Sequence, residues 1–252
     1  MFIIVLMEAA VNFTVPTYIQ IVQGRTPFDT SLAMLPFNLT VFVTATLIVK
    51  FYAKFSPRVI ALFAFTVTTA ALVWLAIVVT NNWESLPTII GLIAFGVGQG
   101  ALVTLVFNVL VTAAPKSLAG DVGSIRGTTQ NLASAVGTAV MGAVLVTTLG
   151  FGVMNAVEEH PELPKELVAQ VDLDNVNFVS NDDLREVLAD TTATPDQVAA
   201  AVEVNEEQRL RTLKLGFLML AGLSAIAAIP ASRLPKYRPE GVGEDEDDDA
   251  AR

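Results

Sequence analysis

One acidic residue, Glu8, lies inside a long apolar stretch, MFIIVLMEAAVNFTVPTYIQIVQ, at the start of the 252-residue chain. A carboxylate in the hydrocarbon of a bilayer is costly, so such groups usually carry protons or face a charged substrate. Asn12, Tyr18 and Gln20 follow on the same stretch, and Pro16 removes a backbone hydrogen bond and can kink a helix. Lipid-facing positions tolerate these features poorly. We therefore predict that the segment lines a cavity, with Glu8 as a proton-carrying residue.

Two alternatives remain open for these residues. If a helix begins near residue 1, a rise of about 1.5 Å per residue places Glu8 only about 10 Å from the helix end, where water can reach it. The polar side chains could also form a structural cluster between helices.

The stretch FGVGQGALV holds Gly96, Gly98 and Ala101 in the spacing of a dinucleotide-binding turn, with Asp121 about 20 residues later. That turn joins a strand to an amphipathic helix, whereas these glycines interrupt a continuous apolar run. Glycine in a membrane helix lets neighbouring backbones approach closely. We interpret Gly96, Gly98 and Gly100 as helix-packing residues and predict no cofactor.

His160, the single histidine, lies among acidic residues without a second metal ligand nearby, and the chain has no cysteine. Thiolate metal sites and disulfides are therefore excluded. We predict no metal site and no catalytic residues, so the chain is not expected to be an enzyme. The alternative, an integral-membrane enzyme, would need convergent catalytic side chains near one interface.

Membrane spans are the elements that must position these residues. The chain is 53% hydrophobic and 16% charged, with a mean hydropathy of +0.58, which is more apolar than soluble domains are. A helix needs about 20 apolar residues to cross a bilayer. Stretches of that length lie at residues 1–23, 31–52, 58–80, 86–113, 124–151 and 211–231. The first is too long for a signal peptide and no small-residue cleavage site follows it. The fold class predicted is an all-α integral membrane protein with a bundle of six transmembrane helices.

Basic residues alternate between the two sides of these spans. One side receives Lys50, Lys54, Arg58, Lys116, Arg126, Arg233, Lys236 and Arg238, and the short loops of the other side hold only Arg25. Lysine and arginine in short loops favour the cytoplasm. We therefore predict a multi-pass plasma membrane protein with both termini in the cytoplasm and a long extracytoplasmic loop.

The acidity of the chain is confined to that loop and to the C-terminal tail. Residues 155–209 hold 14 acidic and 3 basic residues, and residues 240–252 hold 7 acidic residues and 1 basic residue. We predict spans one to five in residues 1–154, an acidic loop with short helices in 155–209, the final span with its basic flank in 210–238, and a disordered acidic tail in 239–252. Nucleic-acid binding is not expected.

Two helix starts are predicted within the loop. Ser180 with Asp183, and Thr194 with Gln197, have the spacing of a capping box, and Pro195 suits the first helical position. The second helix meets no breaker before the last span, so it could continue into that span and project well beyond the membrane.

The fifth span begins with SIRGTTQN and then becomes wholly apolar. Its polar residues Arg126, Gln130 and Asn131 lie at one end of the span, where Arg126 and Gln130 can pair with lipid phosphates, loop carbonyls or a neighbouring helix. Small residues recur at four-residue or near four-residue spacing for close packing, namely Gly123, Gly127, Ala133 and Gly137.

Three segments resemble the fourteen-span drug:proton antiporter family of the major facilitator superfamily. YIQIVQGRTPFDTSLAMLP (18–36) resembles its helix-turn-helix Y-L-Q-x-V-x-G-x-S-P-x-x-A-G-L-x-x-L-P, and KFSPR (54–58) resembles its turn R-F-G-P-R. AGDVGSIRGTTQNLASAVGTAVMGAVL is similar to its penultimate span, A-G-x-x-S-G-x-x-N-T-x-R-Q-L-G-G-A-L-G. Gln130 stands where that family has an arginine, and Arg126 lies one helical turn earlier. The resemblance implies that Arg126, Gln130 and Asn131 belong to a gate-side helix of a transporter.

The resemblance covers the chain to about residue 238 and implies the C-terminal six-span bundle of a proton-coupled multidrug or small-molecule efflux transporter that works by alternating access. The partners implied are membrane lipid, protons, a small hydrophobic or cationic substrate, and the missing N-terminal half or a second copy. Two alternatives are a membrane-anchored interaction protein acting through its extracytoplasmic loop and an inactive truncated fragment.

Overall fold

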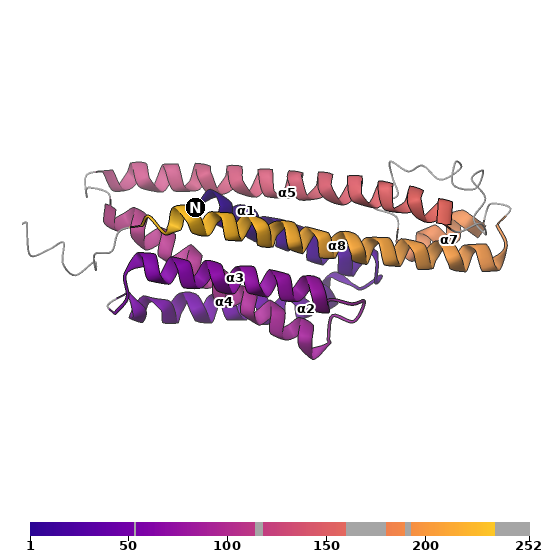
Figure 1. The fold of residues 1–252 in the computed structure, drawn as a ribbon, viewed down its shortest axis with the longest axis horizontal. Coiled ribbons are helices and arrows are strands. Elements are labelled where there is room, and N and C mark those ends of the chain that lie inside the picture. The colour runs from indigo at the N-terminus through magenta and orange to yellow at the C-terminus, as the bar shows by residue number, and fades with distance from the viewer. Residues whose placement is uncertain (53, 114–117, 160–179, 190–192, 235–252) are drawn as a thin grey trace, which may run out of the picture.

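The computed structural model describes residues 1–52, 54–113, 118–159, 180–189 and 193–234, and these residues are helical with short turns between (Figure 1). The helices are α1 (Phe2–Ile21), α2 (Pro27–Ile48), the 3-10 turn η1 (Val49–Phe51), α3 (Pro57–Val78), α4 (Leu86–Ala113), α5 (Ala119–Glu159), α7 (Asn181–Ala189) and α8 (Pro195–Ala231). Six of them, all but η1 and α7, are long and apolar enough to cross a membrane. Each predicted span lies on one of these six, which confirms the all-α membrane fold.

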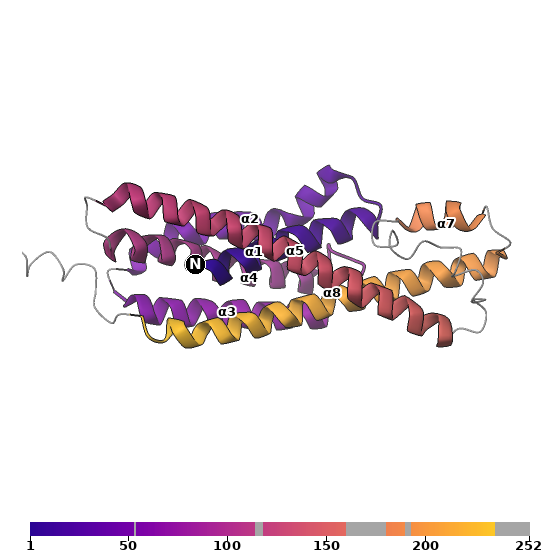
Figure 2. The ribbon, with the colours of Figure 1, turned by 90° about the horizontal axis from the view of Figure 1, so that it is seen from above.

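The six long helices form a bundle in which α4 packs against both α2 and α3 (Figures 1 and 2). On its other face α3 packs against α8, and α1 packs against α5. Large apolar side chains such as Phe42, Phe63 and Ile77 remain exposed on the outside of the bundle. A bilayer is the solvent that suits such a surface.

Glycines allow α2 and α4 to cross closely. A Cβ atom added at Gly96 would lie 2.8 Å from the carbonyl oxygen of Phe37, and one at Gly100 would lie 2.6 Å from that of Val41. On the α3 side of the helix, a Cβ atom added at Gly98 would overlap Oγ1 of Thr68 and lie 3.1 Å from the carbonyl oxygen of Ala64. These three positions therefore leave no room for a side chain.

The glycines of α5 divide into two groups. A Cβ at Gly137 would lie 2.6 Å from the carbonyl oxygen of Leu6, whereas one at Gly123 or Gly127 would meet no described atom within 4 Å. The positions of Gly123 and Gly127 thus have no close neighbour in the described chain, and their packing role stays a prediction.

Two helices are much longer than a bilayer is thick. α5 has 41 residues and α8 has 37, so they extend about 60 and 55 Å against about 30 Å of hydrocarbon. Both project past the other spans at the end of the bundle where α7 lies (Figure 1). Thr194 starts α8 with a complete capping box to Gln197. The predicted continuation of this helix into the last span is confirmed.

Candidate functional site

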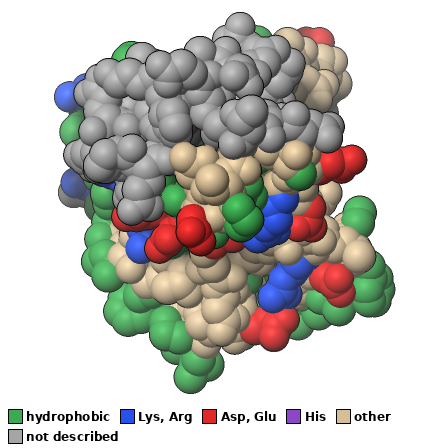
Figure 3. All heavy atoms as spheres, turned by 90° about the vertical axis from the view of Figure 1, so that its right-hand side faces the viewer, with side chains coloured by type: hydrophobic (Ala, Val, Ile, Leu, Met, Phe, Trp, Pro, Cys, Tyr) green, Lys and Arg blue, Asp and Glu red, His purple; other side chains and the backbone are tan. Residues whose placement is uncertain are grey.

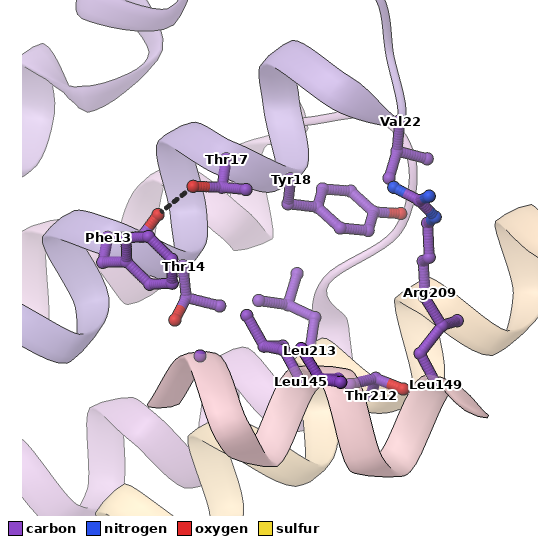
Figure 4. A pocket seen from close by; sticks show the side chains of 12 residues that line it. Phe13, Thr14, Thr17, Tyr18, Val22, Leu145, Leu149, Arg209, Thr212 and Leu213 are labelled. Carbon is purple, nitrogen blue, oxygen red and sulfur yellow. Dashed lines mark hydrogen bonds between the residues drawn. The ribbon is translucent and has the colours of Figure 1, made fainter. Parts of the chain in front are cut away.

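A cavity lies between α1, α5 and α8 in the part of the bundle nearer α7 (Figure 4). Its walls are mostly apolar, formed by Phe13, Val22, Gly142, Leu145, Val146, Leu149 and Leu213. The polar side chains that line it are Thr14, Thr17, Tyr18, Thr212 and Arg209. An apolar cavity with a few placed polar groups is the usual form of a small-molecule site.

Helix α1 supplies three of the polar groups of the cavity wall, Thr14, Thr17 and Tyr18, and α8 supplies Thr212 and Arg209. Thr14, Tyr18 and Val22 recur every four residues, so they lie one above another along the helix. The hydroxyl of Tyr18 donates a hydrogen bond to Oδ1 of Asn81. The Oγ1 atom of Thr14 is buried and has no hydrogen-bond partner among the described residues.

Arg209 brings a positive charge to the wall of the cavity. Its side chain comes from α8 and is 7% exposed, and its Nε donates a hydrogen bond of 3.0 Å to Oδ1 of Asn205. The guanidinium group lies beside the phenol of Tyr18, close enough for an electrostatic interaction (Figure 4). A buried guanidinium beside apolar walls attracts an anionic or strongly accepting group.

Asn181, the first residue of α7, ties that helix to the bundle. Its Nδ2 donates to the carbonyl oxygen of Val22 at 2.9 Å and to Oε1 of Glu206 at 2.7 Å. Its Oδ1 accepts from Nδ2 of Asn205 at 2.9 Å. Its amide therefore joins the end of α1, α7 and α8 around a second, polar hollow that borders the first at Val22. Nothing in the sequence around Asn181 distinguished it from other loop asparagines.

The four residues predicted on the first span do not share one environment. Tyr18 lines the cavity, whereas Asn12 and Gln20 are exposed and Glu8 is half-buried away from the cavity wall. Two residues turn a helix by about 200°, so Asn12 faces away from Thr14 and Gln20 faces away from Tyr18. The structure thus brings only Tyr18 of the four to this cavity.

The predicted gate-side residues lie at the other end of the bundle, on the first turns of α5. The guanidinium of Arg126 stacks over the ring of Phe107 on α4, 4.5 Å from its centre, while Gln130 and Asn131 are exposed. A cation–π contact of this kind favours the neighbouring-helix alternative for Arg126.

Sequence reasoning missed one buried polar side chain in the middle of the bundle. Gln99 on α4 is fully buried, and neither its Oε1 nor its Nε2 has a hydrogen-bond partner in the described part of the chain. A glutamine between two glycines in an apolar run is the signal that could have found it.

No cluster of three or more histidine and acidic side chains that could hold a metal ion occurs among the described residues.

A family model for the Major Facilitator Superfamily matches residues 1–155. The match covers more than half of the chain, and the chain belongs to this superfamily. With six apolar spans it is a multi-pass protein of the plasma membrane.

Two curated relatives are similar to part of this sequence. The multidrug resistance protein Stp of Mycobacterium tuberculosis is 26% identical over 162 residues, which are 64% of this chain and 30% of that protein. The tetracenomycin C resistance and export protein of Streptomyces glaucescens is 24% identical over 138 residues, which are 55% of this chain and 26% of that protein. The alignments thus span less than a third of either relative's length.

Proposed function

We propose that this chain is the C-terminal six-helix half of a proton-coupled efflux transporter that works by alternating access and leaves its substrate chemically unchanged. The names of both relatives refer to resistance, and one refers to export. The single observation that carries the proposal is the mostly apolar cavity between α1, α5 and α8 inside a membrane bundle of this superfamily.

A second bundle is expected to cover α2 and α5. In their most apolar windows only 11% of α2 and 22% of α5 is buried, against 44 to 56% for the other four spans. Superfamily transporters bind substrate between two bundles and rock one against the other. The missing N-terminal half, or a second copy of this chain, is the partner that fits these faces.

The end of the bundle that carries α7 is proposed to face outside, with both termini in the cytoplasm. The described basic residues Lys50, Lys54, Arg58, Arg126 and Arg233 lie at or near the opposite ends of their helices, where lysine and arginine favour the cytoplasm. Figure 3 shows charged side chains of both signs on the part of this end that the structure describes, with hydrophobic side chains along its lower edges. Such a face suits water beyond the membrane surface.

Reading the coding sequence in frame upstream of Met1 tests whether the chain is half of a transporter. The fourteen-span resemblance leaves about eight further apolar spans to be encoded there. A stop codon directly upstream would contradict the proposal of a C-terminal half and leave pairing with a second copy as the route to transport.

Glu8 is the proposed proton-coupling residue, since it is a half-buried carboxyl on a membrane span. In a transporter that contains both halves, Glu8→Gln should reduce proton-driven dye export from everted vesicles about tenfold or more, as expected for loss of a proton-transfer group. Glu84→Gln, which removes an exposed loop carboxylate paired with Arg25, is the matched control and should export normally. Equal export by the Glu8→Gln and Glu84→Gln variants across pH would exclude the coupling role of Glu8.

A further inference from the structure

The turn between α2 and α3 repeats a pair of one basic and one apolar residue. Its sequence, KFYAKFSPRV (50–59), places Lys50, Lys54 and Arg58 four residues apart, and an apolar residue directly follows each of them, namely Phe51, Phe55 and Val59. The turn joins the ends of two membrane-length helices. It therefore brings positive charge and apolar surface together at one end of the bundle.

The two phenylalanines of the turn form one exposed aromatic surface. The ring of Phe51 stacks on that of Phe55 with 6.3 Å between their centres, and the two residues are 47% and 45% exposed. The backbone N–H of Phe55 donates a hydrogen bond of 2.9 Å to the carbonyl oxygen of Phe51, so the turn itself holds the pair together. Val59 and Phe63 continue the exposed apolar surface onto α3. Such a surface beside cations suits the boundary between acyl chains and headgroups.

The cations of the turn have no anionic partner within the described protein. Lys50 and Lys54 are exposed and Arg58 is half-buried, and none of the three forms an ion pair with a described residue. No acidic residue occurs from position 30 to position 83. The first turn of α3 therefore also lacks one, and the dipole of that helix adds to the positive potential of the turn. An anion that also has apolar groups is the complement of this surface.

We propose that the turn between α2 and α3 binds an anionic phospholipid of the cytoplasmic leaflet. The phosphodiester lies among Lys50, Lys54 and Arg58, and the glycerol and upper acyl chains lie on the stacked rings of Phe51 and Phe55. The inference goes beyond the proposed function, because it concerns a lipid that the protein holds and not a molecule that it exports. Only the choice of leaflet rests on the proposed orientation.

The charge of the turn distinguishes among membrane lipids. Phosphatidylcholine has an ammonium group that the three cations would repel, which offsets the attraction of its phosphate. Phosphatidylglycerol has the same phosphate and acyl chains without that ammonium group. Inorganic phosphate has the charge without the apolar part, so it cannot use the aromatic pair.

Native mass spectrometry of the full chain in detergent measures the affinity for the first lipid bound. We expect phosphatidylglycerol to bind about tenfold or more tightly than phosphatidylcholine with the same acyl chains, since basic residues near a membrane surface each attract anionic lipid. Lys50→Gln/Lys54→Gln/Arg58→Gln should remove most of this preference. It should weaken binding of phosphatidylglycerol and leave phosphatidylcholine unchanged.

A second triple variant controls for net charge. Arg211→Gln/Lys214→Gln/Arg233→Gln removes the same charge from α8 and the residues that follow it, at positions that are not buried, and should keep the preference of the parent. Because none of the six side chains is buried, both triple variants should unfold at the temperature of the parent.

Two double variants test the aromatic pair. Phe51→Ala/Phe55→Ala should weaken binding of phosphatidylglycerol several-fold, because it removes the surface on which the glycerol and acyl chains lie. Phe28→Ala/Phe42→Ala truncates two phenylalanines of α2 that are each 70% exposed and lie outside the turn. This control should bind as the parent does.

Three results with the full chain would overturn the inference. They are equal affinity of the parent for the two lipids, equal loss of phosphatidylglycerol binding in the two triple variants, and displacement of the lipid by inorganic phosphate at the concentration of the lipid itself. Loss of the preference in a transporter that contains both halves would assign the turn to a contact with the second bundle instead.

Discussion

Gln99 lies near the middle of α4 with a fully buried amide that meets no described hydrogen-bond partner. Thr68, which lies next to Gly98, has a buried Oγ1 that likewise has no hydrogen-bond partner among the described residues. In a bilayer no bulk water can reach such groups, so each is a cost to the folded bundle. At the residue scale, the core of this protein therefore contains polar atoms that do not stabilise the described state.

Replacing Gln99 with leucine should stabilise the folded bundle. The substitution keeps the side chain near its original size and removes an amide that costs about 1–3 kcal/mol when buried without a partner. Thermal unfolding of the purified protein in detergent measures the change. Gln20→Leu, at an exposed position on α1, serves as the control for added hydrophobicity. A lower unfolding temperature for Gln99→Leu would show that the amide is satisfied in the native protein.

At the scale of the helices, two kinds of contact depend on single residues. Close approach of α4 to α2 depends on glycines, and the attachment of α7 to the bundle depends on Asn181. Gly100 lets α4 approach the backbone of α2 at Val41, while Gly123 on α5 faces open space. Asn181 holds α7 against α1 and α8 through hydrogen bonds of 2.7 to 2.9 Å.

Alanine at Gly100 and at Gly123 should have opposite effects on stability. Gly100→Ala places a Cβ 2.6 Å from the carbonyl oxygen of Val41, so it should destabilise the bundle by about 1–3 kcal/mol through overpacking. Gly123→Ala meets nothing described within 4 Å and should gain up to about 1 kcal/mol of helix propensity. Denaturant titrations of both variants in detergent compare them directly. A destabilised Gly123→Ala variant would indicate that another bundle packs on this part of α5.

Truncation of Asn181 should release α7 from the bundle. Asn181→Ala removes both donor bonds and the acceptor bond of the amide and leaves Asn205 and Glu206 with fewer partners. Amide hydrogen exchange of α7 should become faster, because local opening governs exchange in such an element. Glu186→Ala, at an exposed position on the same helix, should exchange at the parent rate. Unchanged protection in Asn181→Ala would mean that other contacts dock α7.

At the scale of the whole molecule, the bundle has two chemically different ends and two poorly buried flanks. At the α7 end, α5 and α8 extend past the other spans, and the described basic residues Lys50, Lys54 and Arg233 lie at the opposite end (Figure 1). The low burial of α2 and α5 leaves broad apolar faces on the bundle. These features support the proposed orientation of the protein in its membrane and the proposed place of a second bundle.

Cysteine labelling tests the proposed orientation, because the chain has no cysteine of its own. Glu186→Cys on α7 should react in intact cells with a maleimide that cannot cross the membrane. Lys54→Cys, at an exposed position in the turn after η1, should react only after the cells are permeabilised. The reverse pattern would place the termini outside.

Much of the architecture could be predicted from the sequence, because length and hydropathy set the spans and local capping sets their ends. The capping box at Thr194 and the absence of a breaker after it were enough to predict that α8 runs on into the last span. Sequence also predicted the glycines at which helices pack closely, because small residues in apolar runs suggest such contacts. The structure has close neighbours at Gly96, Gly98, Gly100 and Gly137.

The site itself depended on tertiary structure. Because their side chains are polar, Asn12 and Gln20 were predicted to line a cavity. Both lie on the opposite face of α1 from Tyr18 and do not reach the cavity that Tyr18 lines. Arg209 and Thr14 are 195 positions apart, and Asn181 and Val22 are 159 apart. Hydropathy and capping are local properties that the sequence by itself determines. Which faces of distant helices meet depends on the packing of the whole bundle, and only the tertiary structure decided it.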